Sequence, residues 1–546
     1  MSDPQHHKRS SCAAAALIAA VTLPQFLLGL GDRNIWIPLE ARYALVAREM
    51  LDTGQWLLPH LAGAVYADKP PLLFWSIALI SALGPGVTEW TARLPTALAA
   101  VGVCLVTWRL GVRLFSPTTG LLAALVLATS GGFFWSGRQA LPDMLLTLWM
   151  TAAFWALWEW FSGKRRQAAV AAGLCMGFAT LTKGPVGAVL PTLCGLIYLM
   201  APGQLPKLKG WDALLCLGAF LGVTLTWFVP AVALGGLEYA QATLLHHSLE
   251  RYVRAWEHTA PWYYYLAAFP AEFLPWTLFL PQALILGGRL GRHQGREGGW
   301  FALCWLVTIL GFFSISTGKR DIYILPAFPA AALLVGWLWS RWWRLAPEAV
   351  SVRAIRLPAL MLALTLWGLA VVIWGSVDSL LPSRSTLLLL TSPERGVWES
   401  LLLVLAGTLL GSAAIARQTR VMYVLIGGCT WLAMLMTVVW VYTPQFNHRY
   451  PIKSFAVGVH ARVAPDRPLQ LCGPMNDLAL RFNLGRFVPE LHQSAAVMHY
   501  LEGDGEAFCI IETECYQRLG ELTGRFFPIL IRQEFDRSTL LLISNR

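Results

Sequence analysis

Long apolar segments are the feature that most constrains how this chain can fold. Many of them run for about 18 residues or more without a charge, enough for a helix to cross a hydrocarbon layer roughly 30 Å thick. Charged residues make up only 13% of the 546 residues, against roughly 25% in soluble proteins. The pattern predicts an all-α polytopic membrane protein with thirteen spans, at residues 12–30, 92–110, 116–135, 142–161, 167–182, 185–201, 211–234, 266–288, 299–316, 324–340, 357–377, 399–416 and 421–441.

The distribution of basic residues predicts which side of the membrane each loop occupies. Eighteen Lys and Arg residues fall on the side of the N-terminus, and 13 on the opposite side before residue 443. Because basic loops stay in the cytoplasm, we expect a cytoplasmic N-terminus, an uncleaved first helix and an extracytoplasmic C-terminus. The net charge of +11 is scattered over short loops, so it indicates contact with anionic membrane lipids and not with nucleic acid.

One apolar run is too short to be a span. Residues 71–83 number only 13, a length better suited to an interfacial or re-entrant helix. If they crossed the membrane, every later basic loop would switch to the outer side. Residues 31–91 are therefore predicted to form one external loop with juxtamembrane helices, of which the first, at about 38–53, is amphipathic.

The end of the chain differs in character from the rest. Residues 443–546 are more polar, with short apolar runs, and predict a small extracytoplasmic α/β domain that follows a transmembrane domain of residues 1–442. Three cysteines lie in this tail, Cys472, Cys509 and Cys515, and two of them could form a disulfide in an oxidising compartment.

Ionisable and aromatic residues gather in five of the predicted external segments. Such side chains beside a membrane core are costly and often functional. Each segment also has an ordinary explanation, such as an acid at a helix N-terminus, a tight turn, a solvated helix face or contact with lipid headgroups. Together they predict one site that combines phosphate binding with acid–base chemistry. The residues are Glu40, Arg42 and Tyr43; Asp68 and Lys69; Asp143; His247; and Lys319, Arg320 and Tyr323.

The order of these segments resembles the bacterial branch of the dolichyl-phosphate-mannose protein mannosyltransferase superfamily, which includes the aminoarabinose transferases that modify lipid A. The matching segments, within about residues 15–340, are PLEARYALVAREML, YADKPPLLFW, RLFSPTTGLLAALVLATS, LPDM, LERY and GKRDIYILPAFPA. The resemblance implies the GT-C membrane fold in the bacterial inner membrane. It also implies an inverting glycosyltransferase that takes a sugar from a polyprenyl (undecaprenyl) phosphate, with a lipid A-like lipid, a glycan or a protein as acceptor at the periplasmic face.

The resemblance further implies roles for individual residues. Asp68 stands where relatives have a metal-binding acid, and His247 lies near the family's His or Asn position. A divalent cation such as Zn, Mg or Mn is therefore an expectation at this place. The residues that match the donor-phosphate site are Arg42, Tyr43, Lys69, Lys319, Arg320 and Tyr323.

The sequence departs from the family pattern at one important position. Relatives usually read Pro-Asp-Glu-Ala-Arg-Tyr, and that Asp is held to be the catalytic acid or base, but Leu39 follows Pro38 in this chain. Either Glu40 or Asp143 takes over as the carboxylate that draws the acceptor proton, or the enzyme is altered or inactive.

Two other functions involve the same kind of lipid. A non-catalytic binding or transport protein for lipid-linked sugars would carry functional residues on both sides and inside the spans, whereas the motifs of this chain lie on one side. An O-antigen ligase or polymerase lacks the early Glu-Ala-Arg-Tyr and Asp-Lys-Pro motifs and generally has a larger external loop late in the chain. The motifs therefore favour the glycosyltransferase.

Overall fold

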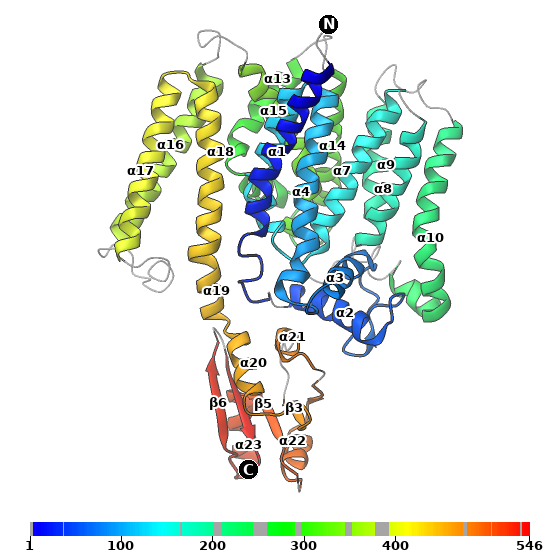
Figure 1. Cartoon of the computed structure of the whole chain (residues 1–546), viewed down its shortest axis with the longest axis vertical. Helices are drawn as coiled ribbons and strands as arrows, with labels where there is room; N and C mark the ends of the chain where they lie inside the picture. The colour runs from blue at the N-terminus through cyan, green and yellow to red at the C-terminus, as the bar shows by residue number, and fades with distance from the viewer. Residues whose placement is uncertain are drawn as a thin grey trace.

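The computed structural model is a bundle of helices with a small sheet beyond one of its ends (Figure 1). The N-terminus lies at the end of the bundle away from the sheet, and the C-terminus lies within the sheet unit. The residues described are 4–35, 38–163, 166–200, 210–243, 259–289, 296–343, 352–376, 393–472, 478–486, 488–503, 505–535 and 538–546.

A helical segment covers each of the thirteen predicted spans. In the described ranges, five helices are long and apolar enough to cross a membrane, or six if one bent pair counts as a broken span. The multi-pass helical fold is confirmed, and the number of spans stays a prediction. The helices are α1 (Pro4–Leu27), α4 (Glu89–Leu114), α5 (Pro117–Ala128), α7 (Pro142–Phe161), α8 (Gln167–Lys183), α9 (Val186–Leu199), α10 (Gly210–Gln241), α12 (Tyr264–Glu272) with α13 (Leu280–Arg289), α14 (Arg296–Ile315), α15 (Phe328–Trp342), α16 (Val352–Ser376), α17 (Pro393–Ile415) and α18 (Thr419–Met436).

The predicted span at 266–288 is bent, which its hydropathy did not reveal. The segments Tyr264–Glu272 and Trp276–Leu286 meet at 109°, with the 3-10 helix η3 (Trp276–Phe279) at the start of the second. Pro275 lies at the break, where its ring and its missing N–H interrupt a regular helix. The bend places Glu272 at the end of a helix instead of inside a straight span.

Two short helices lie beside the bundle at the end that faces the sheet (Figure 1). Helix α2 (Leu39–Thr53) coincides with the predicted amphipathic helix and ends at Gly54, whose φ of 70° is readily available to glycine. Helix α3 (Leu72–Ala82) packs against α2 and α4. Together with a hairpin of β1 (His60–Leu61) and β2 (Ala64–Val65), they fill the long loop before α4.

Glycines allow the central helices to approach closely. A Cβ atom at Gly336 in α15 would lie 2.6 Å from the backbone nitrogen of Ala123 in α5, and one at Gly111 in α4 would lie 2.7 Å from Cα of Gly120. Such contacts between backbones are typical of membrane helices, in which packing rather than the hydrophobic effect holds neighbours together.

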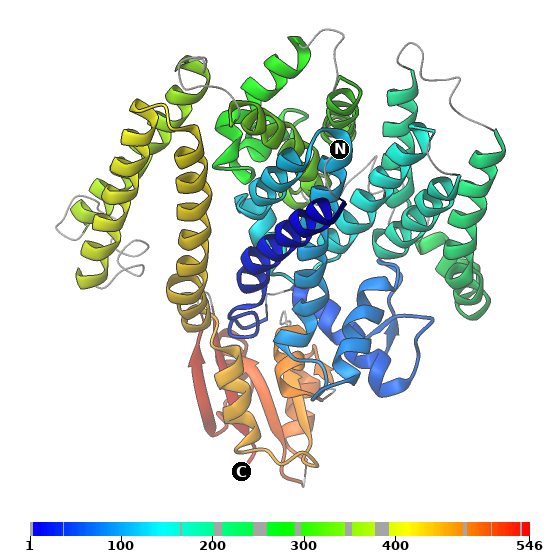
Figure 2. The same ribbon diagram turned by 45° about the horizontal axis from the view of Figure 1, so that its top comes forward.

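The outermost helices expose apolar side chains. Figures 1 and 2 show α10 at one edge of the bundle and the pair α16–α17 at the other, beside α18. On α10, exposed residues include Trp211, Leu214 and Leu237, and on α16 they include Leu364 and Val371. Apolar surface of this extent is typical of contact with lipid tails.

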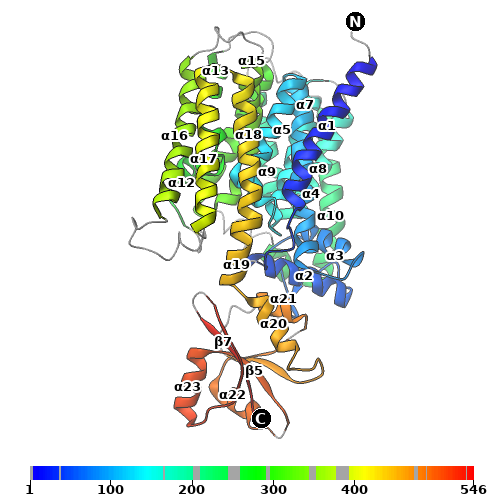
Figure 3. The same ribbon diagram turned by 60° about the vertical axis from the view of Figure 1, so that its left-hand side comes forward.

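The C-terminal unit is a mixed five-stranded sheet with helices on both faces (Figure 3). Strand β3 is parallel to β4 and β5, whereas β7 is antiparallel to β5 and β6. The predicted α/β character is therefore confirmed, and Cys472 is paired with Cys509 in a disulfide between β3 and β5. The elements, after η6 (Thr437–Tyr442) and α19 (Thr443–Arg449), are α20 (Ile452–His460), β3 (Leu469–Cys472), α21 (Leu478–Leu484), β4 (Glu490–Leu491), α22 (Ser494–Leu501), β5 (Phe508–Glu512), α23 (Thr513–Thr523), β6 (Ile529–Glu534) and β7 (Thr539–Ser544).

The sheet unit shares its core with the loop helices. One continuous apolar cluster contains Tyr43 and Phe74 of α2 and α3 together with Phe455, Ile510 and Leu542 of the C-terminal unit. The division between residues 1–442 and 443–546 stays a prediction, because this core crosses it.

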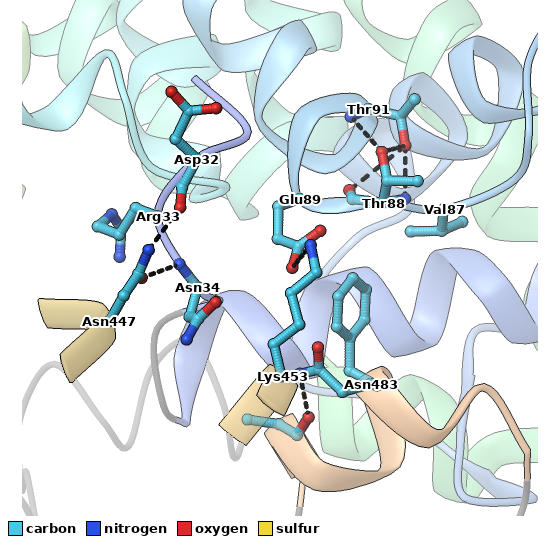
Figure 4. A network of polar contacts seen from close by, with 12 residues as sticks. Asp32, Arg33, Asn34, Val87, Thr88, Glu89, Thr91, Asn447, Lys453 and Asn483 are labelled. Carbon is cyan, nitrogen blue, oxygen red and sulfur yellow. Dashed lines mark hydrogen bonds and ion pairs between the residues drawn. The ribbon is translucent and has the colours of Figure 1, made fainter. Parts of the chain in front are cut away.

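Hydrogen bonds and an ion pair also join α19 and α20 to the segment after α1 and to the start of α4 (Figure 4). Asn447 of α19 accepts a hydrogen bond from the backbone nitrogen of Asn34 at 2.8 Å and donates one to the backbone oxygen of Asp32 at 2.7 Å. Lys453 of α20 lies 3.1 Å from Glu89 at the start of α4. The segment that leaves α1 is therefore held by the chain's last third.

We expect Gly336→Ala to destabilise the bundle by about 1–3 kcal/mol, because the added methyl group overlaps the α5 backbone. Gly218→Ala in α10 is the matched control, since a Cβ there meets nothing within 4 Å. Thermal unfolding in detergent would measure both variants. Equal midpoints for the two would contradict this account of the packing.

Candidate active site

Glu40 is the centre of a buried ion cluster. Its carboxylate is 1% exposed and accepts two hydrogen bonds from Arg93, at 3.0 and 2.9 Å, and two from Arg33, at 3.0 and 2.9 Å. The backbone nitrogen of Ala140 donates a further bond at 2.9 Å. Arg93 also donates to the backbone oxygens of Leu30 and Arg33. This cluster joins the end of α1, α2, α4 and the segment before α7.

The cluster argues against Glu40 as the catalytic base. Burial alone would raise the pKa of Glu40, but the charges of Arg33 and Arg93 outweigh it and lower the pKa to about 2. A carboxylate with so low a pKa is a weak proton acceptor at neutral pH. Its oxygens are, moreover, occupied by five hydrogen bonds. The geometry gives Glu40 a structural role.

Asp143 lies in the first turn of α7 and forms an ion pair with Lys183, the last residue of α8. Both groups are largely buried, with side chains 7% and 14% exposed. The Lys183 ammonium also lies 4.3 Å from the ring centroid of Tyr323, which favours the cation by a cation–π interaction. Asp143 therefore holds a cation against one of the predicted donor-site residues.

Asp68 and Lys69 form a second ion pair, in the turn before α3. Lys69 Nζ lies 2.7 Å from Asp68 Oδ1, and the hydroxyl of Tyr66 donates to Asp68 Oδ2 at 3.0 Å. Burial raises the pKa of Tyr66, which keeps its hydroxyl protonated as a donor. Both oxygens of Asp68 therefore have partners within the loop.

Tyr43 lies among several of the predicted residues. Burial raises the pKa of its phenol, and the carboxylates of Asp68 and Asp143 raise it further. The charges of Arg42 and Arg320 act in the opposite direction. The structure thus brings five predicted residues, from α2, the α3 turn, α7 and the loop after α14, into one electrostatic neighbourhood.

Lys319 and Arg320 lie in the loop between α14 and the 3-10 helix η4 (Asp321–Ala327). The Lys319 ammonium donates to the backbone oxygens of Ser316 and Ala260, the latter at 3.0 Å, which leaves one N–H for another acceptor. The hydroxyl of Tyr265 bonds both backbone groups of Arg320, at 3.1 and 3.2 Å. The loop is therefore held by its backbone, while Arg320 as a whole is partly exposed.

A cavity of about 430 Å³ opens beside this loop, a size typical of ligand sites. It brings cations and carboxylates together with the apolar Leu39 and aromatic rings. The lining residues are Leu39, Glu40, Gly132, Trp135, Ser136, Gln139, Leu141, Tyr264, Glu272, Lys319, Arg320, Asp321, Ile322, Leu325 and Phe328. A small anionic group with a sugar attached matches this mixture of charge and apolar surface.

The metal expectation at Asp68 and His247 stays a prediction. His247 lies outside the described residues, and among those described there is no group of three His, Cys, Asp or Glu able to hold a metal. Asp68 by itself does not fit a cation well, because the ammonium of Lys69 already neutralises it.

Sequence reasoning missed the partners of the predicted acids. Arg93 and Lys183 each stand in or at the end of an apolar segment, and Glu272 interrupts the predicted span 266–288. An ionisable residue in such a segment is itself a functional signal. That signal could have found all three, although it would not have shown that Arg93 meets Glu40 or that Lys183 meets Asp143.

We expect Glu40→Gln to destabilise the protein by about 3–5 kcal/mol, because it leaves two buried arginines without their counter-charge. Asp52→Asn, at an exposed position of the same helix, is the control and should change little. Since the pKa of Glu40 is lowered from 4.5 to about 2, its contribution is complete above pH 4.5 and lost towards pH 2. Thermal unfolding at neutral pH tests the cluster; an unchanged midpoint for Glu40→Gln would refute it.

Known proteins resemble this chain in sequence. Residues 68–232 match the model of the dolichyl-phosphate-mannose-protein mannosyltransferase family. The undecaprenyl phosphate-alpha-4-amino-4-deoxy-L-arabinose arabinosyl transferase of Pseudomonas aeruginosa (strain LESB58) is 33% identical over 318 residues, 57% of each chain. The transferase of the same name from Edwardsiella ictaluri is 33% identical over 331 residues, 59% of this chain and 58% of the relative. The chain thus matches little more than half the length of these relatives.

A solved structure resembles almost the whole chain. The crystal structure of ArnT from Cupriavidus metallidurans bound to undecaprenyl phosphate covers 97% of this chain and 98% of its own, with a TM-score of 0.78 at 21% identity. At this identity the likeness concerns the fold. The resemblance found in the sequence is thereby confirmed: this chain is a multi-pass membrane protein with the GT-C fold, similar to the aminoarabinose transferases and, in residues 68–232, to the dolichyl-phosphate-mannose-protein mannosyltransferase family.

Proposed function

We propose that this protein is an inverting glycosyltransferase that moves a sugar from undecaprenyl phosphate to an acceptor hydroxyl at the periplasmic face of the bacterial inner membrane. The observation that carries the proposal is the cavity in which Lys319 and Arg320 face carboxylates beside the helices of the long loop. The relatives named for undecaprenyl phosphate-linked aminoarabinose support an amino sugar as the first donor to test.

The chemistry follows from the charges of the site. The acceptor oxygen attacks C1 of the sugar, and the bond from C1 to the phosphate oxygen breaks, so that undecaprenyl phosphate leaves with the electron pair. Arg320 and the remaining N–H of Lys319 stabilise the charge that develops on the departing phosphate. Lys183, held by Asp143 against Tyr323, places an ammonium group next to this loop. A carboxylate takes the acceptor proton.

The position of the C-terminal unit supports the proposed orientation. The sheet and the loop helices α2 and α3 lie at the end of the bundle opposite the basic N-terminus (Figure 1). The cavity is lined by Leu39 and Glu40 of α2, so it lies beside these helices. A disulfide such as Cys472–Cys509 is typical of an oxidising compartment. We therefore propose a lipid A-like lipid of the outer leaflet as the first acceptor to test, followed by glycans and proteins.

The decisive experiment is transfer in vitro. Purified protein in bilayers would receive radiolabelled undecaprenyl-phosphate sugars and a membrane extract as the source of acceptors, with and without a chelator. Label that moves to an acceptor with release of undecaprenyl phosphate is the expected result, and the chelator arm tests the metal expectation. Donor binding without transfer would instead favour a binding or transport protein.

We expect Arg320→Ala to lower the rate of transfer roughly 10- to 100-fold, because it removes one charge-assisted hydrogen bond to the phosphate. Arg320→Lys keeps the charge and should retain part of the activity, although lysine cannot make the bidentate hydrogen bonds of a guanidinium group. Because the loop is held by its backbone, both variants should fold normally. Full activity of Arg320→Ala would remove this residue from the donor site.

We expect Asp143→Ala to abolish measurable transfer, because Lys183 loses the partner that holds it near Tyr323. The control is Glu159→Ala in the same helix, whose partner Arg113 is 48% exposed and whose loss should leave transfer intact. Initial rates with expression levels measured in parallel would compare the two. Equal rates for both variants would refute the role of Asp143.

A further inference from the structure

Glu272 is an acid of the cavity that belongs to none of the five motif segments. It is the last residue of α12, directly before the break in the bent pair, and it lines the same cavity as Leu39, Lys319 and Arg320. Among the described residues its carboxylate makes no hydrogen bond or ion pair, so its oxygens are available to a ligand.

The other acids near the cavity are occupied. Glu40 is held by two arginines, and Asp321 accepts a hydrogen bond from the hydroxyl of Tyr264. Asp143 is paired with Lys183 and does not line the cavity. Of the three carboxylates in the lining, Glu272 alone has no partner among the described residues.

The backbone around Glu272 is shaped to receive its side chain. Gly131, the first residue of α6 (Gly131–Ser136), donates its N–H to the backbone oxygen of Leu274 at 3.0 Å, which fixes the end of α12 against α6. A Cβ at Gly132 would overlap the carboxylate of Glu272 and lie 2.9 Å from its Cβ. Only glycine at this position leaves room for the acid.

We propose that Glu272 is the general base of the transfer, an inference that rests on the proposed function. The carboxylate accepts the proton of the acceptor hydroxyl as the oxygen bonds to C1, while the bond from C1 to the phosphate oxygen breaks and its electrons leave with undecaprenyl phosphate. The proton then passes from Glu272 to water, which restores the carboxylate for the next cycle.

Leu39 is consistent with this assignment. In the family pattern an acid precedes the residue equivalent to Glu40, and in this chain an apolar side chain lines the cavity at that position. Glu272 brings a carboxylate into the same cavity from α12. The base is therefore supplied by a different helix, while the cations of the donor loop stay in place.

The test compares Glu272→Gln with the wild-type protein in the transfer assay. We expect kcat to fall about 10²–10⁴-fold, the usual contribution of a general base, with the KM for the donor, undecaprenyl-phosphate binding and the unfolding midpoint unchanged. The fall of the wild-type rate at acidic pH should disappear in the variant. Glu238→Gln, exposed on α10, is the control and should behave as wild type.

A second variant distinguishes a role of Glu272 as a base from a purely structural role. Introducing Leu39→Asp into the Glu272→Gln protein returns a carboxylate to the cavity, and recovery of at least tenfold in rate would support the role of a base. A Glu272→Gln protein that keeps its rate would overturn this inference alone. A loss confined to amino-sugar donors, seen in KM with an unchanged pH profile, would also overturn it and assign Glu272 to recognition of the sugar. Absence of transfer by the wild-type protein would overturn the proposed function and this inference with it.

Discussion

The structure depends on one buried carboxylate shared by two arginines. Desolvation of Glu40, Arg33 and Arg93 is expensive, and only their mutual contacts and the surrounding backbone groups offset it. Because Arg93 also binds the backbone that leaves α1, the cluster sets the position of α2 relative to α1 and α4. The helix that carries Arg42 and Tyr43 is thus fixed from its first turn.

The acids of the site differ in whether a cation pairs with them. Glu40, Asp68 and Asp143 each neutralise a cation and so place helices, turns and positive charge. Glu272 has no cation partner among the described residues, and it lies where the chain bends at the end of α12. A site for transfer from a phosphate needs both kinds of acid: some to hold cations near the leaving group, and one free to accept a proton.

Local signals in the sequence predicted the spans, α2 and the C-terminal α/β unit, since hydropathy and helical periodicity depend on neighbouring residues. Pairings between distant segments were not predictable in this way. Arg93 lies 53 residues from Glu40, and Lys183 lies 40 residues from Asp143, so only the folded chain shows that they meet. The same limit explains why the sequence alone favours Glu40 as a candidate base, whereas the folded chain pairs its carboxylate with two arginines.

The core shared by α2, α3 and the C-terminal sheet has a consequence for how the protein is made. The apolar faces of α2 and α3 are synthesised well before their partners Phe455, Ile510 and Leu542. At typical rates of synthesis the interval is roughly 20 to 90 seconds. During that time the apolar faces of α2 and α3 lack these partners, so a chaperone or the membrane surface must cover them until the sheet folds.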